Sequence, residues 1–287
     1  MNGLQKKRRA ASALLKGLVY GAAALTVALL AALLGYIFVK GLPHITWELL
    51  STGRSVLKGT LGILPNMLNT LYIVALTLLV ALPISVGAAI YLNEYATNKA
   101  LIRAVEFAAE ALSGIPSILY GLVGMLFFCQ MLGLQTSLLA GGFTLSIMVL
   151  PVLMRTTQES LRTVPEGYRQ GALALGATKW YMIRTIILPC AGDGILTGCI
   201  LAIGRIVGES AALLFTAGSA GVLAQNLLDA YRQAGGTLSV ALYLYASEEA
   251  EFDVGFAIAA ILLVLVLCIN GAARLVKRKA RKKERSV

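Results

Sequence analysis

Six long apolar stretches divide the chain, and shorter polar intervals separate them. A helix that crosses a hydrocarbon core of about 30 Å needs about twenty mostly apolar residues, and each stretch approaches or exceeds that length. Hydrophobic residues make up 58% of the chain and charged residues only 14%, a balance that excludes an ordinary soluble domain. We therefore expect an all-α polytopic membrane protein with six transmembrane helices, at residues 17–39, 63–92, 105–131, 137–154, 187–217 and 254–273.

The basic residues predict the orientation of these helices. Of the 25 Lys and Arg residues, 20 fall before the first span, between the second and third, between the fourth and fifth, and after the sixth. By the positive-inside rule both termini then face the cytoplasm. The net charge of +11 therefore reflects topology and contact with membrane lipids, and we expect no nucleic-acid partner. The expected parts are a cytoplasmic basic N-terminus, a first span, a periplasmic segment, a core with five spans and a cytoplasmic basic tail, at residues 1–16, 17–39, 40–62, 63–273 and 274–287.

The cytoplasmic interval 155–186 contains a sequence pattern that predicts two short helices. Val164-Pro165-Glu166 is typical of a helix start, because proline suits the first turn and an acid suits its positive end. Gly176 tolerates a positive φ and predicts a turn. The second helix is expected from residue 177 until Pro189 interrupts it. A helix-turn-helix attached to two spans suggests a handle for another protein.

Arg205 and Glu209 are charged residues about halfway along the fifth span. A spacing of four residues predicts that they share one helical face. Burying such a charge costs about 3 kcal/mol on insertion scales, so charged residues at this depth normally face a partner or a cavity. One interpretation is an ion pair that only holds the bundle together. We favour the other, in which the Arg205 guanidinium meets an anion in a pathway and Glu209 holds that guanidinium in place.

Two sequence patterns are missing. No Gly-x-x-x-x-Gly-Lys-Ser/Thr motif occurs, so we expect no nucleotide-binding loop in this chain. The four cysteines lie within or beside apolar spans without Cys-x-x-Cys spacing. We therefore expect neither a metal site nor a disulfide.

The segment QGALALGATKWYMIRTIILP resembles the cytoplasmic EAA loop of binding-protein-dependent ABC importer permeases. That pattern is Glu-Ala-Ala, three residues, Gly, nine residues, then Ile-x-Leu-Pro. Gly176 and residues 186–189 match it, and Ala172 matches its third position, whereas Gln170 and Gly171 replace the first two. The resemblance implies that the loop contacts an ATPase through Gln170, Gly171, Ala172, Gly176, Leu188 and Pro189.

Further segments extend the resemblance over residues 61–273. They are GILPNMLNTLYIV, AAIYLNEYA, GIPSILYGLVG and RIVGESAALLFTAG, and they are similar to the A subunit of phosphate-type permeases. The resemblance implies a type I ABC importer permease fold and a heterodimer with a second related permease. It also implies two copies of a cytoplasmic ATPase, which binds ATP and Mg²⁺, and a phosphate-binding protein in the periplasm or outside the cell. Arg205 and Glu209 match residues that this family associates with phosphate passage.

The expected function is that of a multi-pass permease subunit, not itself an enzyme, in the cytoplasmic membrane of a bacterium or archaeon. It translocates inorganic phosphate by alternating access, driven by ATP hydrolysis in a separate subunit. One alternative is a permease for another oxyanion, such as sulfate or molybdate. Others are an ATP-independent anion channel or carrier, and a membrane scaffold or sensor. The ATPase-binding loop argues against a channel, which needs no such handle.

Overall fold

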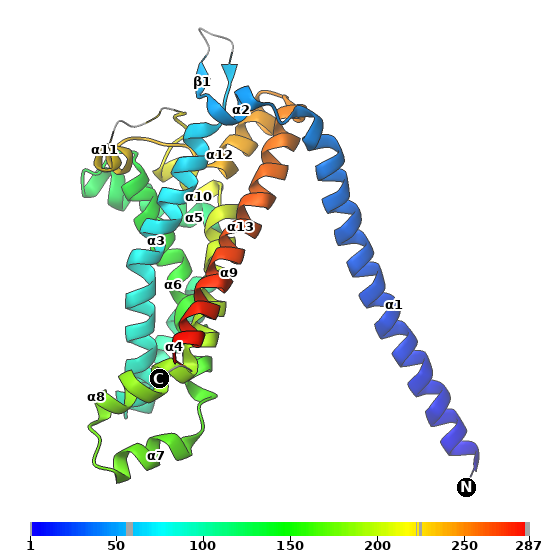
Figure 1. Ribbon diagram of the computed structural model, residues 1–287, viewed down its shortest axis with the longest axis vertical. Helices are drawn as coiled ribbons and strands as arrows, with labels where there is room; N and C mark the ends of the chain where they lie inside the picture. The colour runs from blue at the N-terminus through cyan, green and yellow to red at the C-terminus, as the bar shows by residue number, and fades with distance from the viewer. Residues whose placement is uncertain (1, 56–59, 222, 224–225, 285–287) are drawn as a thin grey trace.

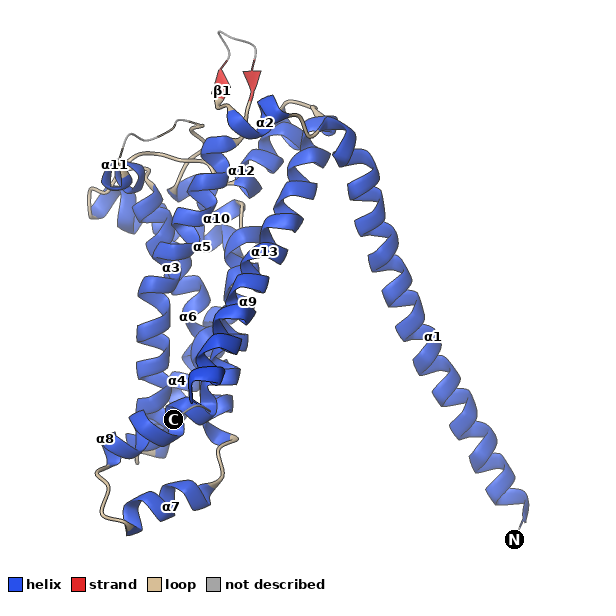
Figure 2. Cartoon of the chain, viewed as in Figure 1, coloured by secondary structure: helices blue, strands red, loops and turns tan. Residues whose placement is uncertain are grey.

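The computed structural model describes residues 2–55, 60–221, 223 and 226–284. Within them the chain is almost entirely helical, apart from a two-stranded antiparallel hairpin of β1 (Arg54–Ser55) and β2 (Thr60–Leu61) (Figure 2). The all-α class predicted from the apolar stretches is confirmed.

The bundle is built from four long helices, α3 (Leu64–Ile90), α6 (Leu138–Arg162), α9 (Leu188–Gly208) and α13 (Phe252–Glu284). Helix α1 (Asn2–Gly41) stands apart and meets α13 only near its C-terminal end, where the rings of Tyr36 and Phe256 lie 5.4 Å apart (Figure 1). The N-terminal end of α1 and the lower end of α13 point to the same end of the molecule as α7 (Glu166–Ala174) (Figure 1). The cytoplasmic location of both termini remains a prediction.

The remaining elements are short and cover the opposite end or link the long helices. They are η1 (Leu42–His44), α2 (Trp47–Ser51), η2 (Tyr91–Tyr95), α4 (Lys99–Ser113), α5 (Ser117–Gly124), η3 (Met125–Met131), α8 (Lys179–Met182), η4 (Ile183–Ile187), α10 (Ala211–Thr216), α11 (Leu227–Arg232), α12 (Leu238–Tyr243) and η5 (Leu244–Glu248). At the end opposite α7, Arg54 pairs with Glu249 at 2.6 Å and lies over the Tyr245 ring. Burial raises the pKa of the Tyr245 phenol above its ordinary value, so it stays neutral there.

The third span is not the continuous helix expected at residues 105–131. Helices α4 and α5 meet at an angle of 99°, with the break at residues 114–116. Pro116 lacks an N–H and disfavours helical geometry at Ile115, which accounts for the break. Among the described residues five helices are long and apolar enough to cross a membrane, and the bent pair gives a sixth if it counts as one broken span.

The fifth span is also broken, contrary to the expectation of one helix over residues 187–217. Helix α9 ends at Gly208, Glu209 has an extended backbone with φ −82° and ψ 122°, and α10 begins at Ala211. Short broken helices at membrane depth are tolerated where they are buried in protein or line a cavity.

Three other prolines leave their helices unbroken. Pro83 lies inside α3 and Pro151 inside α6, which runs on to Arg162. Pro189 does not interrupt its helix either: residues 179–208 form one continuous rod. The π-helical turn η4 lies directly before Pro189 and re-spaces the backbone where the proline has no N–H to offer. The expected interruption at Pro189 was therefore wrong.

Helices α3 and α6 form the most extensive contact of the bundle. Polar side chains bridge them to backbone carbonyls: the hydroxyl of Ser85 donates to Leu150 at 3.2 Å and that of Ser146 to Thr77 at 3.4 Å. In lipid, close packing and hydrogen bonds of this kind hold helices together, because the hydrophobic effect does not distinguish a neighbouring helix from lipid tails. This pair is the frame on which the site is built.

Candidate functional site

The hairpin of α7 and α8, called the coupling hairpin below, lies at the lower end of the bundle (Figure 1). Helix α7 begins at Glu166 directly after Pro165, and Gly176 forms the turn with φ +81°. Thr178 then caps α8, its hydroxyl accepting from the N–H of Tyr181 at 3.3 Å. The predicted helix-turn-helix and its glycine turn are confirmed, although the second helix begins at Lys179.

The six residues that match the coupling pattern fall in two places. Gln170, Gly171 and Gly176 are exposed on the coupling hairpin, whereas Ala172 is buried against its base. Leu188 and Pro189 lie beyond the π-turn, at the start of α9, and therefore outside the hairpin. The three exposed residues are accessible to another protein, whereas Leu188 and Pro189 join the hairpin to the span α9.

Large apolar side chains are exposed on the coupling hairpin. Leu175 at the turn is 91% exposed. The others, each at least half exposed, are Tyr168, Leu173, Trp180 and Tyr181. Exposed aromatic and apolar residues at a charged end of a protein mark an interaction surface. The geometry therefore supports the predicted handle and adds the side chains that would fill a partner's cleft.

Arg169 of α7 ties the coupling hairpin to the rest of the subunit. Its Nε and one terminal nitrogen donate to Oε1 of Glu94 at 3.2 and 3.0 Å. The terminal nitrogens also donate to the carbonyls of Leu161 and Val164 and to the carboxylate of Glu166. Sequence reasoning missed this arginine, because Glu94 lies 75 residues earlier and no local pattern joins the two.

A second contact joins the hairpin to the same turn of the chain. The ammonium of Lys179, the first residue of α8, lies 4.9 Å from the centre of the Tyr95 ring. Such cation–π contacts contribute roughly 0.5–1 kcal/mol at exposed sites. Both helices of the coupling hairpin thus rest on η2, the π-helical turn that ends α3.

Within the bundle, the structure separates the two charged residues that the sequence placed together. Glu209 is buried just beyond the end of α9, and its Oε1 accepts from the N–H of Ala212 at 3.1 Å, which caps α10. Arg205 is half-buried and forms no ion pair within 4.0 Å among the described residues. The two side chains do not form an ion pair, because α9 ends at Gly208 between them and the Glu209 carboxylate caps α10.

The surroundings of Arg205 include the broken third span. Arg205 lies within electrostatic range of Tyr120 on α5. Helices α5 and α10 pack closely, so that a Cβ added at Gly121 would lie 2.9 Å from Cα of Ala212. The helices that follow the two breaks therefore pack against each other near the arginine.

At each of the two breaks, a side-chain hydroxyl from another part of the chain donates a hydrogen bond to a backbone carbonyl. In a continuous helix the carbonyl of Leu112 would accept from residue 116, but Pro116 has no N–H; that carbonyl accepts instead from the N–H of Ile115 at 3.2 Å and from the Tyr120 hydroxyl at 2.7 Å. At the second break the hydroxyl of Ser239 donates to the carbonyl of Val207. These two carbonyls thus have partners within the protein, as membrane depth requires.

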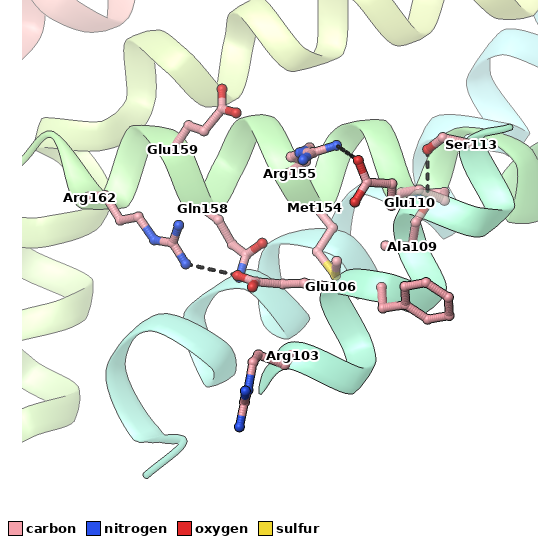
Figure 3. A pocket seen from close by; sticks show the side chains of 12 residues that line it. Arg103, Glu106, Ala109, Glu110, Ser113, Met154, Arg155, Gln158, Glu159 and Arg162 are labelled. Carbon is pink, nitrogen blue, oxygen red and sulfur yellow. Dashed lines mark hydrogen bonds and ion pairs between the residues drawn. The ribbon is translucent and has the colours of Figure 1, made fainter. Parts of the chain in front are cut away.

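A groove of about 360 Å³ lies between α4 and α6 (Figure 3). Arg162 pairs with Glu106 at 2.9 Å and Arg155 with Glu110 at 3.8 Å across it. All four side chains are well exposed, so each pair contributes about 1 kcal/mol or less. These contacts hold α4 against α6 only loosely.

Gln170 stands where the family pattern has an acid, and its exposure allows a direct test. We expect Gln170→Glu to retain phosphate uptake within about twofold, because a carboxylate near the middle of an exposed helix face costs a few tenths of a kcal/mol at most. Uptake by membrane vesicles that contain the complex checks this, with Gln233→Glu, an exposed site outside the spans and away from the hairpin, as the control. A loss of tenfold or more from Gln170→Glu alone would mean that this loop departs from the family chemistry.

Comparisons with known proteins place the chain among transport components. A family model described as "Binding-protein-dependent transport system inner membrane component" matches residues 81–282. The phosphate transport system permease protein PstA of Haemophilus influenzae is 32% identical over 270 residues, which cover 93% of this chain and 94% of that protein. The probable ABC transporter permease protein YqgI of Bacillus subtilis is 36% identical over 196 residues, covering 68% and 67%.

Solved structures share the fold. A bacterial alginate ABC transporter in complex with an alginate pentasaccharide-bound periplasmic protein aligns with a TM-score of 0.65 and 18% identity, covering 96% of this chain and 98% of that chain. An inward-facing conformation of the MetNI methionine ABC transporter aligns with a TM-score of 0.61 and 22% identity, covering 76% and 94%. At these identities the likeness carries the architecture alone, and it agrees with the importer permease fold expected from the loop.

Proposed function

Because the chain belongs to the inner membrane components of binding-protein-dependent transport systems, we propose that it is the permease subunit of an ATP-driven importer for inorganic phosphate. The observation that carries the proposal is the nearly full-length similarity to the PstA permease of Haemophilus influenzae. The coupling hairpin supports it independently, since it presents the surface that a motor subunit needs.

The subunit is a multi-pass membrane protein. Like the permeases to which it is similar, it is not itself an enzyme. We infer that it pairs with a second related permease, and that two copies of a cytoplasmic ATPase bind ATP and Mg²⁺ and hydrolyse the nucleotide. A phosphate-binding protein in the periplasm or outside the cell delivers the ion. The unpaired length of α1, which lies outside the bundle, leaves an apolar surface for the second permease and for lipid.

The proposed path runs past the two broken spans. Arg205 supplies positive charge there, and Glu209 shapes the path by ending α9 and capping α10. Broken helices of this kind serve as contact points and hinges when two halves of a transporter rock between outward-open and inward-open states. Phosphate is held weakly, because an ion that must leave quickly cannot be bound tightly on the way.

Uptake measurements separate this function from its rivals. The complex that co-purifies with this chain is reconstituted in vesicles with the binding protein, and uptake of labelled phosphate is followed with and without ATP. We expect uptake to require ATP. We also expect a tenfold excess of sulfate or molybdate to change the uptake by no more than about twofold, as for an importer that selects phosphate. Uptake without ATP would instead support a channel or carrier, and strong competition by sulfate or molybdate an importer of another oxyanion.

A further inference from the structure

We propose that Arg169 and Glu94 lock the coupling hairpin to the cytoplasmic end of α3, so that α3 moves together with the hairpin when the ATPase changes state. This inference rests on the proposed function. The covalent connections of the hairpin lead only to α6 and α9, and α3 lies far from it in the chain. The Arg169–Glu94 contact gives the hairpin a third, non-covalent connection, directly to α3.

The hydrogen bonding of Arg169 is complete. A guanidinium has five N–H donors, and all five donate here: two to Glu94 and one each to Glu166, Leu161 and Val164. The bonds to Leu161 and Val164 hold the corner between α6 and α7, and the bonds to Glu94 cross to η2. A lysine could not reproduce this planar fork, so the position selects arginine.

Burial makes the contact more specific than a surface ion pair. The side chain of Arg169 is 12% exposed and that of Glu94 only 5%. The Glu94 carboxylate also accepts from the amide of Asn93 at 2.7 Å, which holds it in place. Removing either partner leaves a charge in surroundings that solvate it poorly, so the pair favours one arrangement of hairpin and span over all others.

The second contact keeps the hairpin from pivoting about the first. Lys179 over the Tyr95 ring joins α8 to η2, as Arg169 over Glu94 joins α7 to it. Two attachments from two helices to one five-residue turn restrict rotation as well as separation. Because α3 also packs along α6 for most of its length, motion of the hairpin then reaches both helices of the frame at once.

The first test removes only the part of the contact that crosses to α3. Glu94→Ala leaves the bonds from Arg169 to Leu161 and Val164 available, so the corner of the hairpin can still form. In the reconstituted complex we expect phosphate uptake per ATP hydrolysed to fall about tenfold, while ATPase co-purification and hydrolysis stay within about twofold. Glu106→Ala, which breaks an exposed ion pair between α4 and α6, is the matched control and should leave both rates unchanged. A parallel fall of uptake and hydrolysis, or unchanged uptake, in Glu94→Ala would overturn the lock.

The second test replaces the ion pair with a covalent bridge. The four native cysteines are changed to alanine, Glu94→Cys and Arg169→Cys are introduced, and a short bifunctional thiol reagent joins them. We expect the unbridged double variant to be uncoupled and the bridged one to regain uptake, because the two segments stay together throughout the cycle. Arrest of ATP hydrolysis or of transport by the bridge would show that they must separate. ATP hydrolysis in the bridged complex does not depend on which ion is carried, so it tests the lock separately. If the unaltered complex takes up no phosphate, that result counts against the proposed function alone.

Discussion

Phosphate uptake is expected to fall by two orders of magnitude or more in Arg205→Ala, while membrane insertion and complex assembly are retained. Arg205 forms no ion pair within 4.0 Å among the described residues, so its guanidinium is not engaged by a carboxylate at contact distance. Each hydrogen bond from a charged donor to an anion contributes roughly 1.5–3 kcal/mol, and a guanidinium offers two in parallel. Initial rates of labelled phosphate uptake in vesicles measure the effect.

Two variants separate a contact with the ion from a structural role. Arg205→Lys keeps the charge without the planar fork and should retain part of the uptake. Arg103→Ala removes an exposed arginine from α4, outside the ATPase-binding loop, and should leave uptake within about twofold, as surface substitutions usually do. Normal uptake in Arg205→Ala would remove this residue from the path. Loss of co-purifying subunits in that variant would instead favour the scaffold reading.

The second large effect is expected from Gly176→Val at the turn of the coupling hairpin. The backbone at Gly176 has φ +81°, a region that a β-branched residue adopts only at a cost of about 1–3 kcal/mol. Nothing crowds the position, since no atom lies within 4 Å of an added Cβ, so the cost comes from the backbone alone. We expect the two helices to lose their mutual angle, with less co-purifying ATPase and at least a tenfold loss of uptake.

Gly167→Ala is the matched control for this change. Gly167 is also an exposed glycine of the coupling hairpin with open space around it, but its φ is not positive. Alanine there should be neutral or slightly stabilising, because it suits a helix better than glycine does. If Gly176→Val assembles and transports like the unaltered chain, the glycine turn is dispensable for coupling.

The local part of the candidate site was predictable from the sequence. Pro165 and Gly176 act on the residues beside them, so the start of α7 and the turn after it could be located without tertiary information. The fork of Arg169 could not, because its acceptor Glu94 is brought to it only when α3 packs along α6. The same holds for the neighbours of Arg205, where spacing predicted Glu209 and packing supplied Tyr120.

The sequence by itself determined which segments are apolar enough to enter a membrane, and on which side the basic residues gather. Tertiary structure decided which of those segments are continuous. Pro83 and Pro151 sit inside unbroken helices, yet the third span breaks at Pro116. A proline removes one N–H donor from its helix, and at Pro116 the N–H of Ile115 and the Tyr120 hydroxyl satisfy the carbonyl that this donor would have met.

At both breaks a side-chain hydroxyl from outside the interrupted turn donates to a backbone carbonyl. The Tyr120 hydroxyl reaches back to Leu112 from the next helix, and Ser239 reaches Val207 from 32 residues along the chain. In a medium without water an unpaired carbonyl costs several kcal/mol, so these partners decide where a helix can end. Only packing brings them into place, which is why the sequence predicted two straight spans and the structure has two broken ones.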